Sequence, residues 1–92
     1  MTEIAATDLV ELIDELEASK QNTRFERLVT VCTRAFGPPG KSRGRGSHLK
    51  FKTPWKGDPR INLQRSKGGK AKSYQVEQVL AALRRLQEAQ EE

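Results

Sequence analysis

Three segments of the chain repeat apolar residues at the spacing of an amphipathic helix. The first segment, residues 7–20, carries an apolar stripe made of Leu9, Leu12, Ile13 and Leu16. The second, which follows Thr23, has its stripe at Phe25, Leu28, Val29, Cys32 and Phe36. The third, residues 73–88, has its stripe at Val76, Val79, Leu80, Leu83 and Leu86. This periodicity predicts three helices, each with one face buried in a core.

Polar residues and glycine mark where these helices begin and end. Thr7 is predicted to cap the first helix, and Thr23 with Glu26 has the form of a capping box for the second. Gly37 is followed by two prolines, which is a strong stop signal for that second helix.

Between the second and third helices, the apolar residues alternate with period two. Leu49 and Phe51 share one face of a predicted strand over residues 47–53, and Ile61 and Leu63 share one face of another over residues 60–64. The opposite face would carry the polar residues His48, Lys50, Lys52, Arg60, Asn62 and Gln64. The glycine-rich residues 40–46 fit either a short edge strand or a loop. The pattern therefore predicts an α+β fold in two layers, with helices covering the apolar face of a small sheet of two or three strands.

Charge is concentrated in the middle of the chain. The net charge is +5, yet residues 41–72 carry eleven lysines and arginines against the single carboxylate of Asp58, while both flanking segments are net negative. Such a block is typical of a protein that binds a polyanion. The alternative is a solvated basic loop, which the ratio of charges disfavours.

Several classes of protein are disfavoured by composition. Cys32 is the only cysteine, so the chain cannot form an internal disulfide or a cysteine cluster for zinc, and a reducing cytoplasm is the expected location. Because Cys32 lies on an apolar helix face, we expect it to be buried and inert. The N-terminus lacks the pattern of a secretory signal, and no apolar run approaches the length of a membrane span. The basic block offers too few carboxylates and histidines for a catalytic metal, so we expect no metal and no cofactor.

His48, the only histidine, lies within the basic block. Its side chain exchanges protons near neutral pH, and Ser47 is a poor partner because adjacent strand residues point to opposite faces. Metal-free RNA cleavage fits these residues, because RNA supplies its own 2′-hydroxyl nucleophile and needs one proton-transfer group with nearby cations. The group that protonates the leaving oxygen stays open among water, a lysine and Tyr74.

The hypothesis assigns His48 as general acid or base and a set of cations as the RNA-binding residues: Lys41, Arg43, Arg45, Lys50, Lys52, Arg60, Lys67, Lys70 and Lys72. The alternative is a non-catalytic RNA-binding module in which His48 contacts phosphate passively. Trp55 either stacks on an unpaired base or caps one end of the core, and we favour the core because aromatic side chains mostly serve burial. Tyr74 has the same two interpretations.

One run of residues resembles a known family. The string from Gly46 to Trp55, with Ser47, His48 and Phe51 at its centre, continues through residues 57–64 and resembles the HicA toxins, small mRNA interferases of bacterial toxin–antitoxin systems. Residues 69–80 are similar to the C-terminal region of that family, and the likeness extends over roughly residues 24–86.

The resemblance implies a fold like the double-stranded-RNA-binding domain, in which a helix, a three-stranded antiparallel sheet and a second helix follow one another. It implies that His48 is catalytic and that a HicB-like antitoxin protein is the partner. The chain would then divide into an N-terminal helical extension, residues 1–22, and a HicA-like domain, residues 23–90, within one compact unit. The chain departs from the family in that extension, which either completes the core or binds a partner, and in the glycine-rich segment where a first strand is expected.

Overall fold

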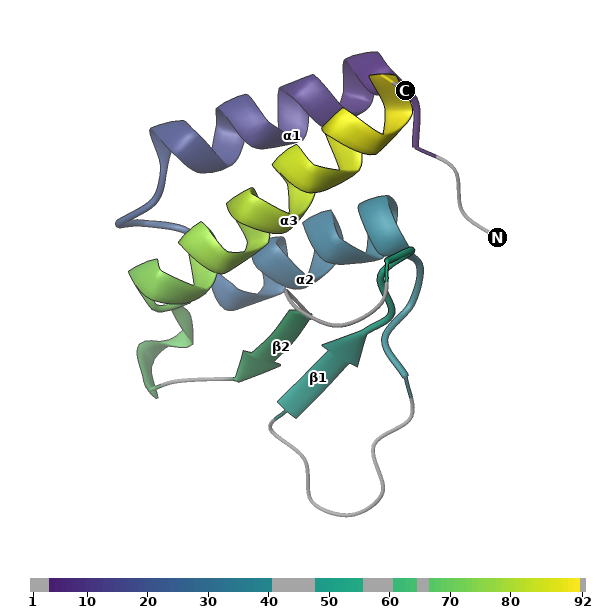
Figure 1. The fold of residues 1–92 in the computed structure, drawn as a ribbon. Helices are drawn as coiled ribbons and strands as arrows, with labels where there is room; N and C mark the ends of the chain where they lie inside the picture. Colours follow the sequence, from purple (N-terminus) through teal and green to yellow (C-terminus); the bar gives the residue numbers. More distant parts are fainter. Residues whose placement is uncertain (1–3, 41–47, 56–60, 65–66, 92) are drawn as a thin grey trace.

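The structure is a computed structural model that describes residues 4–40, 48–55, 61–64 and 67–91, and leaves the side chains of His48, Lys67 and Glu91 undescribed. Within these described residues, three helices and two strands follow one another, with a short 3₁₀ turn, η1, before the last helix (Figure 1). Their bounds are α1 Ala6–Ala18, α2 Phe25–Phe36, β1 His48–Phe51, β2 Ile61–Gln64, η1 Lys67–Gly69 and α3 Ser73–Glu91. The predicted α+β class, with helices and a small antiparallel sheet, is confirmed.

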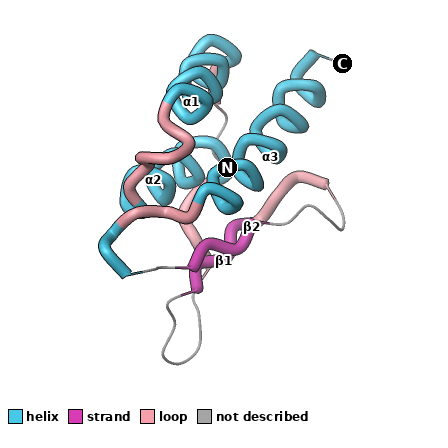
Figure 2. The backbone as a smooth tube through the Cα atoms, turned by 90° about the vertical axis from the view of Figure 1, so that its left-hand side faces the viewer, coloured by secondary structure: helices cyan, strands magenta, loops and turns pink. Residues whose placement is uncertain are grey.

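The two strands form an antiparallel hairpin, and the helices lie together on one side of it (Figure 2). The register pairs His48 with Gln64, Leu49 with Leu63, Lys50 with Asn62, and Phe51 with Ile61. Phe51, Ile61 and Leu63 are buried and Leu49 packs against the core, as the alternation predicts. Most of residues 40–46, where a further strand was an open question, lies outside the described residues.

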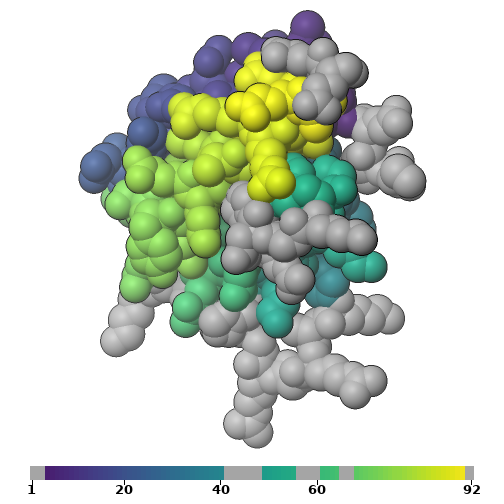
Figure 3. Space-filling model, viewed as in Figure 1, coloured from purple at the N-terminus to yellow at the C-terminus, as the bar shows by residue number. Residues whose placement is uncertain are grey.

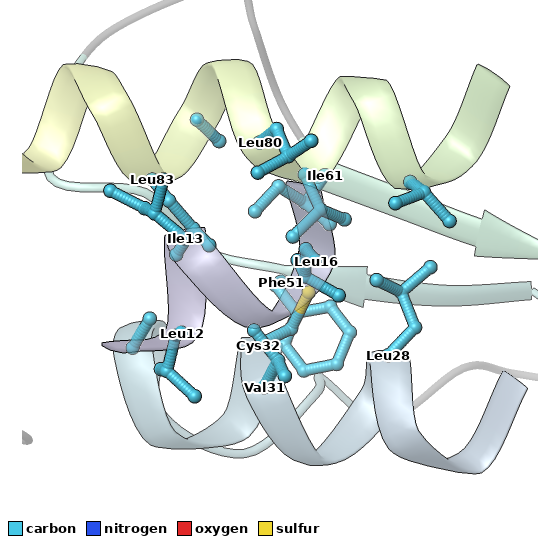
Figure 4. Packing of buried hydrophobic residues seen from close by; sticks show 14 of the residues in the cluster. Leu12, Ile13, Leu16, Leu28, Val31, Cys32, Phe51, Ile61, Leu80 and Leu83 are labelled. Carbon is cyan, nitrogen blue, oxygen red and sulfur yellow. The ribbon is translucent and has the colours of Figure 1, made fainter. Parts of the chain in front are cut away.

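The core joins all three helices to the inner face of the hairpin, and α1 belongs to it fully. The four stripe residues of α1 are buried, and α1 packs mainly along α3. Figure 4 shows side chains from α1, α2, α3 and both strands pointing toward one another, with Leu16 near the centre. Because burying one leucine side chain stabilises a fold by about 1.5–3 kcal/mol, the N-terminal helix contributes substantially to the stability of this small domain.

The predicted helix starts are wrong in detail at two positions. Thr7 lies inside α1, which begins one residue earlier and has Ala5 at its N-cap without a side-chain bond. Thr23 does not cap α2, because Arg24 occupies the N-cap position. The Thr23 hydroxyl instead donates to the carbonyl oxygen of Ser19, at 2.7 Å. Since Thr23 is buried, this bond satisfies its hydroxyl and also one carbonyl just beyond the end of α1.

The predicted end of α2 is confirmed. Gly37 has a φ of 93°, a conformation that glycine adopts without steric cost. Its N–H donates to the carbonyl of Thr33 at 2.9 Å, which closes the last turn. This stop directs the chain away from the helical layer before β1 begins.

Candidate nucleic-acid interface

The outer face of the hairpin is polar and exposed. Lys50, Asn62 and Gln64 are exposed because each alternates with an inward apolar neighbour. The register sets Lys50 directly opposite Asn62, so an ammonium group and an amide project from neighbouring positions. Together they offer hydrogen-bond donors for phosphate oxygens and both donors and acceptors for sugar and base edges.

His48 is the first residue of β1, and its backbone is paired with Gln64. It precedes Lys50 by two positions, and residues two apart in a strand belong to the same face of the sheet. Its side chain lies outside the part of the structure that is described. The prediction that His48 shares a face with Lys50 therefore rests on the register and the exposed neighbours.

The predicted RNA-binding cations divide into three groups. Four of them are described and exposed: Lys50, Lys52, Lys70 and Lys72. Lys67 is placed by its backbone in η1. The remaining four lie outside the described residues: Lys41, Arg43, Arg45 and Arg60. The hairpin and the first turns of α3 both reach the lower half of the surface seen in Figure 3.

Arg24 is a cation that the sequence analysis missed. An antiparallel β-bridge joins Arg24 to Lys70, and the N–H of Ala71 donates to the carbonyl of Thr23 at 2.9 Å. Arg24 therefore lies beside the basic residues that precede α3. No sequence signal marks this contact, because Arg24 belongs to a net acidic segment far from Lys70 along the chain.

Glycines allow this close approach. Gly68 and Gly69 have φ values of 86° and 75°, which residues with a side chain rarely adopt. A Cβ at position 69 would also lie 3.4 Å from Nη2 of Arg24. The turn before α3 thus favours glycine for its backbone conformation, and the Arg24 side chain lies in van der Waals reach of it.

Most ion pairs in the described part tie α1 to the other two helices. Glu15 accepts two hydrogen bonds from the Arg27 guanidinium, at 2.5 and 2.6 Å, and Asp8 pairs with Arg34. These contacts connect α1 to α2, and the Arg27 hydrogen bonds lower the pKa of the Glu15 carboxyl despite the opposing effect of partial burial.

Two further ion pairs connect α1 and the turn after it to α3. Glu17 pairs with Arg84, and Lys20 lies 3.4 Å from a carboxylate oxygen of Glu77. In contrast, Lys50, Lys52 and Lys72 have no carboxylate partner within the described residues. The carboxylates of these ion pairs thus bind cations within the helical layer, and Lys50, Lys52 and Lys72 stay available for an anionic ligand.

Cys32 is buried, as predicted. It is fully inaccessible in the core, and burial raises the pKa of its thiol to about 12. A thiol with such a pKa is almost entirely protonated at neutral pH, so it is neither a nucleophile nor a metal ligand. Within the described residues no three His, Cys, Asp or Glu side chains are grouped so as to hold a metal ion.

Comparisons with protein-family models, with characterised proteins and with solved structures gave no match to this chain. In the described part of the chain, no helix combines the length and apolar content that a membrane span requires.

Proposed function

We propose that this protein is a metal-independent endoribonuclease that resembles the HicA mRNA interferases and uses His48 for proton transfer. The observation that supports this most is the polar outer face of the hairpin, where exposed Lys50, Asn62 and Gln64 occupy the positions nearest His48 in the register. Histidine is the side chain best suited to proton transfer at physiological pH, and on this face the exposed neighbours offer donors for phosphate.

The proposed reaction uses the nucleophile that RNA carries. His48 as general base removes the proton of a 2′-hydroxyl, and the 2′-oxygen forms a bond to the adjacent phosphorus. The bond from phosphorus to the 5′-oxygen breaks, and that oxygen takes up a proton from water, a lysine or Tyr74. Lys50 stabilises the additional negative charge on the phosphoryl oxygens. The products are a 2′,3′-cyclic phosphate and a 5′-hydroxyl end, so DNA is not a substrate.

We propose a more specific fold for the chain as well. The order α2, β1, β2, α3 is compatible with a double-stranded-RNA-binding-domain-like arrangement. A HicB-like antitoxin would be the protein partner and would cover the hairpin face. Because that face carries exposed lysine side chains, an acidic surface on the antitoxin would complement it.

The test compares an RNA oligonucleotide with an otherwise identical oligonucleotide that carries 2′-deoxyribose at the cleaved nucleotide. Both are incubated with the protein in the presence of a chelator, and the products are resolved by mass. We expect the RNA to give a 2′,3′-cyclic phosphate and the deoxy-substituted position to stay intact. Cleavage at the deoxy position, or loss of all cleavage on chelation, would contradict the mechanism. If RNA binds but is not cut, the non-catalytic RNA-binding module is the better assignment.

A further inference from the structure

Among the five aromatic side chains of the protein, all within the described residues, one is exposed. Phe25 and Phe51 are buried in the core, and Phe36 and Trp55 pack against it. Tyr74 is 57% exposed as a residue. Tyr74 lies in the first turn of α3, directly after the basic residues of the preceding turn. An exposed aromatic ring beside cations is a feature of proteins that stack on nucleobases.

Trp55 is not the aromatic that serves such a role. The Phe36 ring meets it edge-on, with centroids 6.0 Å apart and an interplanar angle of 89°. The Arg85 guanidinium lies over the Trp55 ring at 4.7 Å from its centroid, so one face of the indole is already covered. Trp55 therefore caps the core, as the sequence favours.

The surroundings of Tyr74 are cationic. The ammonium nitrogen of Lys72 lies over the Tyr74 ring at 6.0 Å from its centroid, farther than Arg85 lies from Trp55, and the backbone of Lys70 is bridged to Arg24 on the adjoining segment. The first turn of α3 contains no acidic residue. The nearest carboxylate along α3, that of Glu77, is paired with Lys20. A phosphate group near Tyr74 would thus meet the positive charges of Lys72 and Arg24, and the carboxylate nearest to Arg24 along the chain is that of Glu26 in the first turn of α2.

We propose that Tyr74 stacks on an unpaired nucleobase of the bound RNA while Lys72 and Arg24 contact the phosphates on either side of that nucleotide. This inference rests on the proposed function only in that RNA is the ligand. It names the substrate class as RNA that is single-stranded where it crosses the start of α3. A continuous duplex would not supply this contact, because its bases are stacked on one another and their faces are covered.

The test measures binding of the full-length protein to RNA that carries 2′-O-methyl ribose and therefore cannot be cleaved through the 2′-hydroxyl. One probe is a single strand of mixed sequence, and the other is a duplex of the same length. Three variants are compared with the unaltered chain: Tyr74→Ser, Tyr74→Phe and Val10→Ser. Val10 is the matched control, because it is the other exposed large hydrophobic residue in the described part and lies on α1.

We expect Tyr74→Ser to weaken single-strand binding by about 5- to 150-fold, with duplex binding unchanged. Tyr74→Phe keeps the ring and should bind as the unaltered chain does, as should Val10→Ser. The salt dependence should be the same for Tyr74→Ser, whereas Lys72→Gln should reduce the slope of log affinity against log salt by about 0.7. A 2-aminopurine placed along the strand should be quenched at one position by the unaltered chain and not by Tyr74→Ser.

Three results would overturn the inference. They are unchanged single-strand affinity in Tyr74→Ser, an equal loss for strand and duplex, and the absence of any RNA binding by the unaltered chain. Circular dichroism of each variant separates a stacking defect from misfolding, and Tyr74→Phe keeps the test decisive because it removes only the hydroxyl. Since the probes cannot be cleaved, this test can establish stacking even if the protein proves not to cleave RNA. Conversely, RNA cleavage by the protein would not be contradicted if Tyr74 proved to make no contact with RNA.

Discussion

For single residues, the local sequence predicted the burial of Cys32 but not the hydrogen-bond partner of Thr23. Cys32 lies on an apolar helical stripe, and that pattern alone predicted its burial. Thr23 had a glutamate three positions later and so matched a helix cap, yet its hydroxyl bonds back to Ser19. A threonine hydroxyl can accept from a following amide as a helix cap or donate to a carbonyl four residues earlier, and the turn between α1 and α2 brings the Ser19 carbonyl within reach. Local sequence does not specify that closure.

Glu15 gives a pH-dependent prediction at the same scale. Arg27 lowers the pKa of Glu15 in the folded protein below its ordinary value of 4.5. The ion pair therefore stabilises the fold above the pKa of the unfolded chain, and the stabilisation is lost as the pH falls through the lower folded pKa. Because both side chains are more than a third exposed, Glu15→Gln should reduce the free energy of unfolding at neutral pH by only about 0.5 kcal/mol.

Urea denaturation at pH 7 and at about pH 2 checks this prediction, since few carboxylates stay ionised at the lower value. At low pH, Glu15→Gln and the unaltered chain should unfold with the same free energy. Glu11→Gln, at an exposed position one turn earlier on α1, is the control and should have little effect at either pH. Two results would show that the Arg27 contact is not the cause. One is an equal loss of unfolding free energy in both variants, and the other is a loss for Glu15→Gln that persists at low pH.

At the scale of elements, periodicity was the stronger guide. The apolar stripes predicted all three helices, and the alternation predicted which hairpin residues lie inward, because burial imposes a repeat that the sequence displays directly. No sequence pattern predicted the bridge between Arg24 and Lys70, because a contact between distant segments depends on how α2 and α3 pack. The role of α1 was also open in the sequence, and its packing against α3 settles it as part of the core.

Leu16 tests whether α1 is an essential part of the fold. Its side chain is fully buried, and Leu16→Ala should lower the free energy of unfolding by about 2–5 kcal/mol, because the lost contacts leave a cavity. Denaturant titration followed by circular dichroism measures the change. Val10→Ala, on the exposed face of the same helix, should cost less than about 0.5 kcal/mol. If Leu16→Ala were as mild as Val10→Ala, α1 would be an appendage rather than a core helix.

Over the whole molecule, the two layers have different charge environments. Carboxylates of α1 are paired with arginines of α2 and α3, whereas the lysines of the hairpin face project from a sheet with no carboxylate beside them in the described part. The ion pairs thus lie within the helical layer, whereas the exposed lysines on the hairpin side are suited to an anionic polymer. His48 lies in the strand that carries this exposed basic face.

The most direct test of the central claim is the rate at which the His48→Ala variant cleaves RNA, measured in chelator beside its RNA affinity. General acid–base catalysis contributes about 100- to 10,000-fold, so cleavage should fall by a factor in that range. Affinity should change by no more than about twofold, because phosphate contacts from the lysines supply most of the binding. A His48→Ala variant that cuts RNA at the rate of the unaltered chain would contradict the assignment of His48 as the proton-transfer group.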